Sequence, residues 1–419
     1  MKKILLIVAL STLSVGAFAA TAQETLQFYK QELSAFPTKD SAATRAYAAS
    51  LADGLQTWLL QNGRNEAIPE ALLWQARLQT KAGQNGAALV TLLKLRYTTP
   101  ADTTQLVALL NENLDVLDKD SRTDAGKALL KGASDKASFA EQKEAEMLYA
   151  LSKLKGKKFY PAAAQAFEGF FVRNPRYEGN NEVELWYGDL HRMNGNYLAA
   201  IAQYKKADVL YPNSPYKAAS LRLIGDIYAD NLKNTAAATE AYTTVLRLYP
   251  NSSETGIVYK HMAILDENNK QYDSALINYG KAIELLDNTP AVYEAYRGKA
   301  DVYVKTKQYE PAYQTLHHAA QLTNVKPEQA AEALVEAANI ARKKLKDDTK
   351  YVQSLQKAIL LQPSGKDTPV WMYDVGAAYE KAGKTAQAQE MYKKLILQFP
   401  TSKYASSAQS GLTRLGKTK

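Results

Sequence analysis

The sequence predicts an all-α protein built as an array of helix pairs. The first observation behind this prediction is a set of small, aromatic and proline residues, such as Gly188, Ala200, Tyr204 and Pro212, whose spacing returns along most of the 419 residues. The second is the repeat length, because a period of 20–50 residues is typical of stacked supersecondary units. The third is a proline after most second segments, where it cannot continue a helical hydrogen-bond ladder.

Eight units share this pattern, with a small or apolar residue at position 8 of all but one. These residues are Ala76, Leu151, Gly188, Gly225, Ala263, Ala300, Asn339 and Gly376. From Gly188 onward they lie 37, 38, 37, 39 and 37 residues apart, whereas 75 residues separate Ala76 from Leu151. A degenerate ninth unit is therefore expected near 104–139. Its candidate residues are Leu109, Asn113, Val116, Ala125 and Leu129.

These residues resemble the tetratricopeptide repeat (TPR), two helices with a nominal period of about 34 residues. The resemblance covers about 69–402 and implies a right-handed superhelical solenoid of helix-turn-helix repeats. It also implies a protein-binding surface and no catalytic site. Because a solenoid buries its core one neighbour at a time, the array counts as one elongated domain.

The two ends of the chain differ from the array. Residues 1–22 resemble a cleaved signal peptide, with Lys2 and Lys3 before an apolar stretch at 4–15 and a small-residue site ending at Ala22. Gln23 is then the expected first mature residue, and a cut after Ala19 is the second choice. Residues 23–68 are expected to form an N-terminal helical segment, and 403–419 a cap helix and tail.

Composition limits the possible functions. The chain has no cysteine, which excludes disulfides, thiol catalysis and cysteine-ligated zinc. The formal net charge is +9, or +7 without Lys2 and Lys3. The basic clusters at 153–158 and 342–346 are interpreted as solvated helix ends, with contact to an anionic surface polymer as the alternative. Nucleic acid is not an expected partner, and no transmembrane segment is expected.

No residue pattern indicates chemistry. The four histidines, His191, His261, His317 and His318, form no metal-ligand spacing, and the glycine-rich and nucleophile motifs of enzymes are absent from the sequence. We therefore expect no enzyme, no cofactor and no metal. Most of the 27 tyrosines occupy packing positions. Packing is therefore favoured over sugar stacking as their role.

In TPR proteins, positions 2, 5, 9 and 12 of each first helix line the concave groove, and this resemblance implies the candidate binding residues. These are Arg77, Lys155, Asp189, Arg192, Arg222, Asp226, Lys260, Ile264, Arg297, Asp301, Lys343 and Tyr373. Arg222 with Asp226, and Arg297 with Asp301, are spaced to form i,i+4 ion pairs. The remaining excess is basic, so the sequence favours a partner segment of acidic and apolar character.

The repeat endings at 211–216, 249–252 and 399–404 read YPNSPY, YPNS and FPTSKY. They resemble cell-envelope members of the TPR family, of the Tol–Pal coordinator and outer-membrane-assembly types. This resemblance implies a periplasmic scaffold in a bacterial envelope, with a protein or peptide as partner. The alternative is a helical-repeat protein that binds glycan or peptidoglycan, for which Tyr373 is the clear candidate.

Overall fold

The computed structural model describes residues 21–63, 65–99, 103–287 and 289–417, and all regular structure in these ranges is helical. The chain divides into two compact units, Met1–Ser220 and Leu221–Lys419. We call them the N-terminal and C-terminal units. The expected signal peptide lies outside the described residues, except for Thr21 and Ala22. No helix among the described residues is long and apolar enough to cross a membrane.

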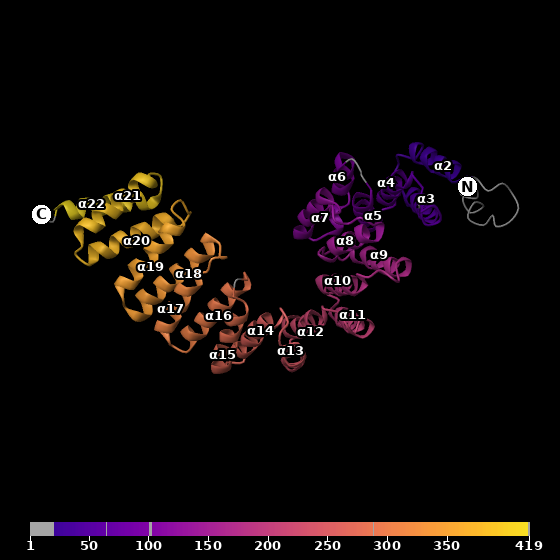
Figure 1. Ribbon diagram of the computed structural model, residues 1–419. Coiled ribbons are helices and arrows are strands. Elements are labelled where there is room, and N and C mark those ends of the chain that lie inside the picture. Colours follow the sequence, from indigo (N-terminus) through magenta and orange to yellow (C-terminus); the bar gives the residue numbers. More distant parts are fainter. Residues whose placement is uncertain (1–20, 64, 100–102, 288, 418–419) are drawn as a thin grey trace. The chain divides into compact units, whose positions relative to one another are not determined.

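The N-terminal unit consists of helices that follow one another in chain order (Figure 1). They are α2 (Ala22–Ser34), α3 (Ala42–Gln61), α4 (Ile68–Lys81), α5 (Asn85–Thr98), α6 (Thr103–Asn111), the 3₁₀ turn η1 (Leu114–Val116), α7 (Lys119–Lys131), α8 (Ala140–Ser152), α9 (Tyr160–Arg173), α10 (Asn180–Met193) and α11 (Tyr197–Leu210). Residues 104–139, where the degenerate repeat was expected, contain α6, η1 and α7.

The C-terminal unit continues the series of antiparallel helix pairs. After α12 (Lys217–Asp226), which begins just before the unit boundary, it contains η2 (Ile227–Asn231), α13 (Thr235–Leu248), α14 (Thr255–Asn268), α15 (Tyr272–Leu285), α16 (Ala291–Lys305), α17 (Tyr309–Ala319), α18 (Pro327–Ile340), η3 (Ala341–Leu345), α19 (Asp348–Leu361), α20 (Thr368–Lys381), α21 (Thr385–Gln398) and α22 (Lys403–Lys417). Second helices end about two residues before their prolines, as α13 does before Pro250.

A glycine and a tyrosine bring the two helices of a pair together. In α20 and α21, a Cβ placed on Gly376 would lie 2.5 Å from Cε1 of Tyr392, a side chain that is fully buried. The tyrosine hydroxyl reaches back to the first helix, where it donates to Glu380 at 2.8 Å. The glycine is therefore required for close approach, and the tyrosine supplies both buried area and a satisfied polar end.

The turn between paired helices uses a left-handed residue. Glycine occupies this place in some pairs, as Gly195 does with φ 79°. In four successive pairs of the C-terminal unit it is a lysine, namely Lys233, Lys270, Lys307 and Lys346, with φ between 54° and 61°. A side chain in this region costs roughly 1–2 kcal/mol because its Cβ approaches a carbonyl oxygen.

Two pairs contain one residue more than the others, and both accommodate it as a π-turn. In ordinary pairs, the turn is closed by a hydrogen bond from a backbone N–H to the carbonyl five residues earlier, as from Asn196 to His191. In the pairs with η2 and η3, the corresponding hydrogen bond reaches the carbonyl six residues earlier, from Asn234 to Tyr228 and from Asp347 to Ala341. The extra residue near 230–234 can be read from the sequence, where Gly225 and Tyr242 are one residue further apart than Gly188 and Tyr204, whereas the one in η3 was not expected.

The second π-turn corrects the assignment of Asn339 to position 8. Asn339 is exposed, whereas Ala338 is completely buried. Ala338 lies 17 residues before Leu355. The same interval of 17 separates Gly225 from Tyr242 in the other π-containing pair. Position 8 is therefore Ala338, and the extra residue had shifted the count by one.

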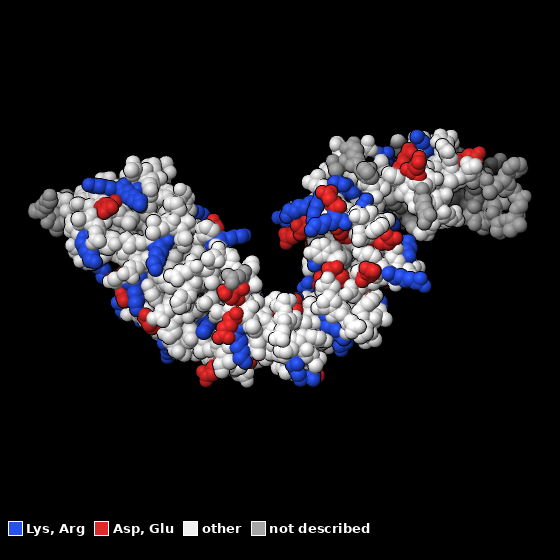
Figure 2. Space-filling model, viewed as in Figure 1, with Lys and Arg blue, Asp and Glu red and all other residues white. Residues whose placement is uncertain are grey.

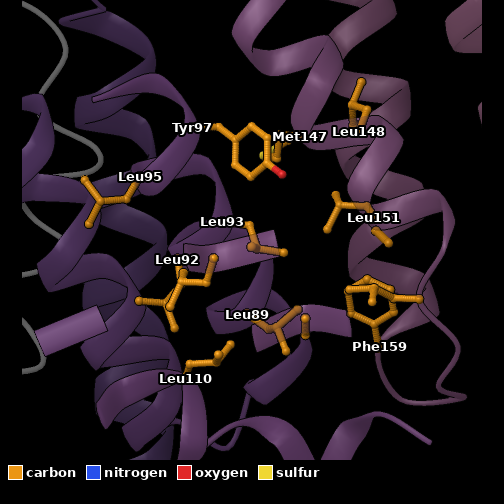
Figure 3. Close-up of a cluster of buried hydrophobic side chains, with 14 of the residues drawn as sticks. Leu89, Leu92, Leu93, Leu95, Tyr97, Leu110, Met147, Leu148, Leu151 and Phe159 are labelled. Atoms are coloured by element: carbon orange, nitrogen blue, oxygen red, sulfur yellow. The ribbon is translucent and has the colours of Figure 1, made fainter. Parts of the chain in front are cut away.

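The buried core of the N-terminal unit is mostly aliphatic. Figure 3 shows leucines of α5 facing Leu148 and Leu151 of α8, with Phe159 beside them. Leu89, Leu92, Leu148 and Phe159 are all fully buried. This cluster joins α6, η1 and α7 to their neighbours, since Leu109, Val116, Ala125 and Leu129 belong to it as well.

Candidate binding face of the first helices

Charged side chains link the first helix of one pair to the first helix of the next. Arg222 of α12 donates to Asp226 on its own helix and to Glu254 at the start of α14, each at 2.5 Å. Asp226 also accepts from the Tyr242 hydroxyl at 2.8 Å, and His261 Nδ1 lies 2.7 Å from it. The predicted Arg222–Asp226 pair is present, but these two groups are satisfied inside the protein.

The hydrogen bonds fix the charge state of this cluster. Burial alone would raise the pKa of Asp226, but the hydrogen bond and charge of His261, together with Arg222, hold that pKa below its usual range. Burial and the adjacent Asp226 carboxylate raise the pKa of the Tyr242 hydroxyl far above its usual value. Asp226 is therefore ionised and Tyr242 neutral, which makes the cluster a structural link between repeats.

A similar cluster surrounds Asp189 in the N-terminal unit. This buried carboxylate accepts from the Tyr204 hydroxyl at 2.9 Å, and Lys153 and Arg192 lie 3.1 and 3.3 Å from it. Asp189 and Arg192 were both candidate groove residues. The structure places them together, with Asp189 largely withdrawn from solvent.

Arg297 pairs differently from the prediction. Its guanidinium donates to Glu336 of α18 at 3.1 Å, and no bond to Asp301 is present among the described residues. Partial burial raises the pKa of Asp301, and the nearby carboxylates of Glu336 and Glu267 raise it further. The i,i+4 spacing on α16 was therefore insufficient to identify the partner of Arg297, because Glu336 lies on the next first helix.

Three other candidates belong to none of these clusters. Arg77 of α4 is 3.4 Å from the Gln105 side chain on α6. Lys155 is in the loop after α8 and not on a first helix, and its ammonium lies 3.3 Å from Asp118. Lys343 is exposed within η3.

Tyr373 is packed and not presented as an open aromatic platform. Its ring lies 5.9 Å from that of Tyr392 and 5.8 Å from that of Tyr404, measured between centroids. The side chain belongs to the apolar cluster that joins α20 to α21 and α22. Its observed role is therefore to close the end of the array.

Lys260 and Ile264 remain as the accessible pair. They lie four residues apart on α14, and Ile264 is 40% exposed. Among the described residues, Lys260 has no hydrogen-bond or ion-pair partner. Charged side chains of both signs are interspersed on the face of each unit seen in Figure 2, and that face shows no broad single-sign area.

A cavity of about 280 Å³ opens beside Ile264. Its wall is formed by the turn after α12 and by one side of α14. The lining residues are Ala229, Asp230, Lys233, Thr235, Tyr242, His261, Ile264, Leu265, Asn268 and Asn269. Two of them, Ala229 and Asp230, belong to the π-turn η2, so the extra residue contributes directly to this cavity. The sequence indicated the insertion, but not that it lines a cavity.

The histidines are used in packing and hydrogen bonding. Nδ1 of His191 lies 2.8 Å from the Tyr160 hydroxyl, and Nε2 of His317 lies 2.9 Å from the Ser354 hydroxyl. Burial lowers the pKa of His191 and that of His317, the latter to about 4. Within the described ranges, no three acidic or histidine side chains are grouped to hold a metal.

The comparison with known families agrees with the helix pairs. The family model described as "Tetratricopeptide repeat" matches residues 219–252 and 372–402. These two segments match tetratricopeptide repeats, and the chain has the TPR fold. The two matches contain the Gly225–Tyr242 and Gly376–Tyr392 pairs, and the fold extends the same helix-pair arrangement well beyond them.

Several solved structures are similar to the chain. MamA is 20% identical, with 42% of this chain and 94% of MamA covered and a TM-score of 0.30. PilF of Pseudomonas aeruginosa is 15% identical, covering 55% and 97% with a TM-score of 0.35. PilW, described as a type IV pilus biogenesis factor, is 16% identical, covering 56% and 100% with a TM-score of 0.34. Curated proteins provided no match.

Proposed function

We propose that this TPR protein is an exported scaffold of the bacterial cell envelope that binds a partner protein on α14. The observation that carries the proposal is the cavity beside Ile264, next to the unpartnered Lys260. The other basic candidates on first helices are mostly engaged, as Arg222 is with Asp226 and Glu254. A partner can therefore reach this pair without first breaking internal ion pairs.

The dimensions and lining of the cavity indicate the kind of partner. Its 280 Å³ falls just below the roughly 300–1,000 Å³ of small-molecule sites, and it is open to solvent. It can hold one large side chain of a bound segment. Ile264 and Leu265 provide apolar contact, while Lys260 provides a positive charge one helical turn away. The complementary segment has an apolar anchor followed by an acidic residue.

Export is the second part of the proposal. It is supported by the basic start, apolar stretch and small-residue sites within residues 1–22. Cell fractionation tests it directly. We expect a chain shortened at its N-terminus in the periplasmic fraction, whereas a full-length chain in the cytoplasm would contradict export.

The binding site is tested by affinity capture with two matched double variants. Lys260→Glu with Ile264→Asp reverses the charge and removes the apolar contact. Lys393→Glu with Leu397→Asp makes the same changes four residues apart on α21, where both side chains are exposed. Reversal of Arg222 is avoided, because it would place a third carboxylate against Asp226 and Glu254.

We expect the α14 variant to weaken binding of the captured protein at least about tenfold, which corresponds to roughly 1.4 kcal/mol. The α21 variant should bind like the unmodified chain. Circular dichroism melts of both variants establish that each remains folded. Equal binding by the two folded variants would exclude α14 as the site, and a co-purifying glycan without protein would favour the alternative function.

A further inference from the structure

The N-terminal region contains two small-residue cleavage sites three residues apart. Ala17-Phe18-Ala19 would release a chain that begins at Ala20, and Ala20-Thr21-Ala22 one that begins at Gln23. Small residues at the first and third positions make both acceptable to a signal peptidase. The sequence pattern alone slightly favoured the second. The folded structure bears on the choice, because Thr21 and Ala22, which the second cut would remove, make hydrogen bonds in it.

Thr21 is the N-cap of α2. Its hydroxyl accepts a hydrogen bond from the Glu24 backbone at 3.2 Å, and its own backbone N–H donates to the Glu24 carboxylate at 2.7 Å. Together these bonds form a capping box, which satisfies N–H groups that a helix start otherwise leaves open. Removal of such a cap typically costs about 0.5–2 kcal/mol.

Ala22 is bonded to the core of the N-terminal unit. Its carbonyl accepts the indole N–H of Trp58 at 2.9 Å, across 36 residues of sequence. Trp58 is only 4% exposed and belongs to a buried cluster with Leu51, Leu55 and Trp74. Because the indole nitrogen is a donor only, loss of the Ala22 carbonyl would leave a buried N–H without its acceptor.

A cut after Ala22 would also place a new charge unfavourably. The α-ammonium of Gln23 would lie in the first turn of α2, where the helix dipole is already positive. A cut after Ala19 leaves Thr21, Ala22 and their bonds in place.

We propose that the signal peptidase hydrolyses the bond between Ala19 and Ala20, so that the mature protein begins at Ala20. Water adds across the peptide bond, which gives Ala19 a carboxylate and Ala20 an ammonium group. This inference depends on export, as proposed above. In the proposed mature chain, the Thr21 cap and the Ala22 carbonyl that accepts from Trp58 are both retained.

Intact mass and N-terminal sequencing of the chain recovered from envelope fractions test the proposal. A start at Ala20 supports it. A start at Gln23 overturns it while leaving export intact. A chain that retains its first residues overturns both this inference and export.

A second experiment tests the physical reason. Two full-length mature forms are prepared, one beginning at Ala20 and one at Gln23, and amide exchange of α2 and α3 is compared. We expect at least about tenfold slower exchange in the Ala20 form, and a smaller ratio in a Trp58→Phe background, which removes the indole donor. Equal exchange in the two unmodified forms would overturn the argument.

Discussion

Gly376→Ala should destabilise the C-terminal unit, although alanine is the better helix former. In an open helix position the same substitution gains about 1 kcal/mol. Gly280 in α15 is such a position, since the nearest atom to an added Cβ is the flexible end of Lys299 at 4.0 Å. At Gly376 the added Cβ would lie 2.5 Å from Tyr392 Cε1.

The size of the destabilisation follows from the displacement of the Tyr392 ring and the loss of its hydrogen bond. Carbon atoms in contact prefer about 3.5–4.0 Å, so the ring must move by roughly 1 Å or more. It is confined on its other edge, where a Cβ on Gly411 would likewise lie 2.5 Å away. Overpacking of this kind costs about 1–3 kcal/mol, and loss of the hydrogen bond to the Glu380 carboxylate about 1.5–3 kcal/mol. After the helix gain of about 1 kcal/mol is subtracted, we expect a net loss of about 1.5–5 kcal/mol.

Urea denaturation combined with amide exchange of α20 and α21 provides the measurement. Gly280→Ala is the matched control and should be stabilising or neutral. Tyr392→Leu should cost less in the Gly376→Ala background than alone, because the two substitutions share one contact. A Gly376→Ala protein as stable as the Gly280→Ala protein would refute the packing argument.

Three further predictions concern the turns and the charged clusters. Lys270→Gly and Lys307→Gly should each raise stability by about 0.5–1 kcal/mol in thermal melts, because φ of 61° and 60° is strained for lysine and free for glycine. His317 has a pKa near 4 in the folded chain and about 6.5 when unfolded, so its contribution is complete above pH 6.5 and is lost as the pH falls toward 4. His317→Asn should flatten that part of the stability profile by roughly 1–3 kcal/mol, a range reduced from the full pKa shift because solvent partly screens this half-buried side chain. Asp226→Ala should cost about 3–5 kcal/mol in urea denaturation, since it leaves Arg222 half-paired in a buried cluster.

Each of these has a contrary outcome. Lower melting temperatures for the two glycine variants would show that the lysine side chains contribute contacts that outweigh the strain. An unchanged acid limb in His317→Asn would assign the pH dependence to other groups, such as His191, whose pKa is also lowered by burial. A loss below about 1 kcal/mol in Asp226→Ala would show that water replaces the carboxylate.

The helix pairs could be predicted because their packing depends on residue types at fixed intervals. A glycine opposite a tyrosine, as at Gly376 and Tyr392, is required by a close helix approach and appears directly in the sequence. The π-turn at η3 could not be predicted with equal ease. An extra residue inside a helix leaves the residue pattern on either side of it unchanged. Position 8 was therefore assigned to Asn339 instead of Ala338.

The binding face was predicted only in outline. Positions on first helices are set by the repeat, but whether a charge there is free depends on the neighbouring repeat. Arg297 bonds to Glu336, which is 39 residues away in the sequence, and Asp189 pairs with Lys153, which is 36 residues away. Such partners follow from tertiary packing and not from local spacing. Lys260 differs from the engaged candidates only through contacts that the sequence does not contain.

A photo-crosslinking amino acid placed at Ile264 would test the proposed scaffold most directly. The same amino acid at Leu397, which is 82% exposed on α21, serves as the matched control in the same unit. We predict that irradiation of living cells links position 264 to one envelope protein, and that Lys260→Glu reduces the yield. A partner captured equally from both positions, or from position 397 alone, would contradict a binding site on α14.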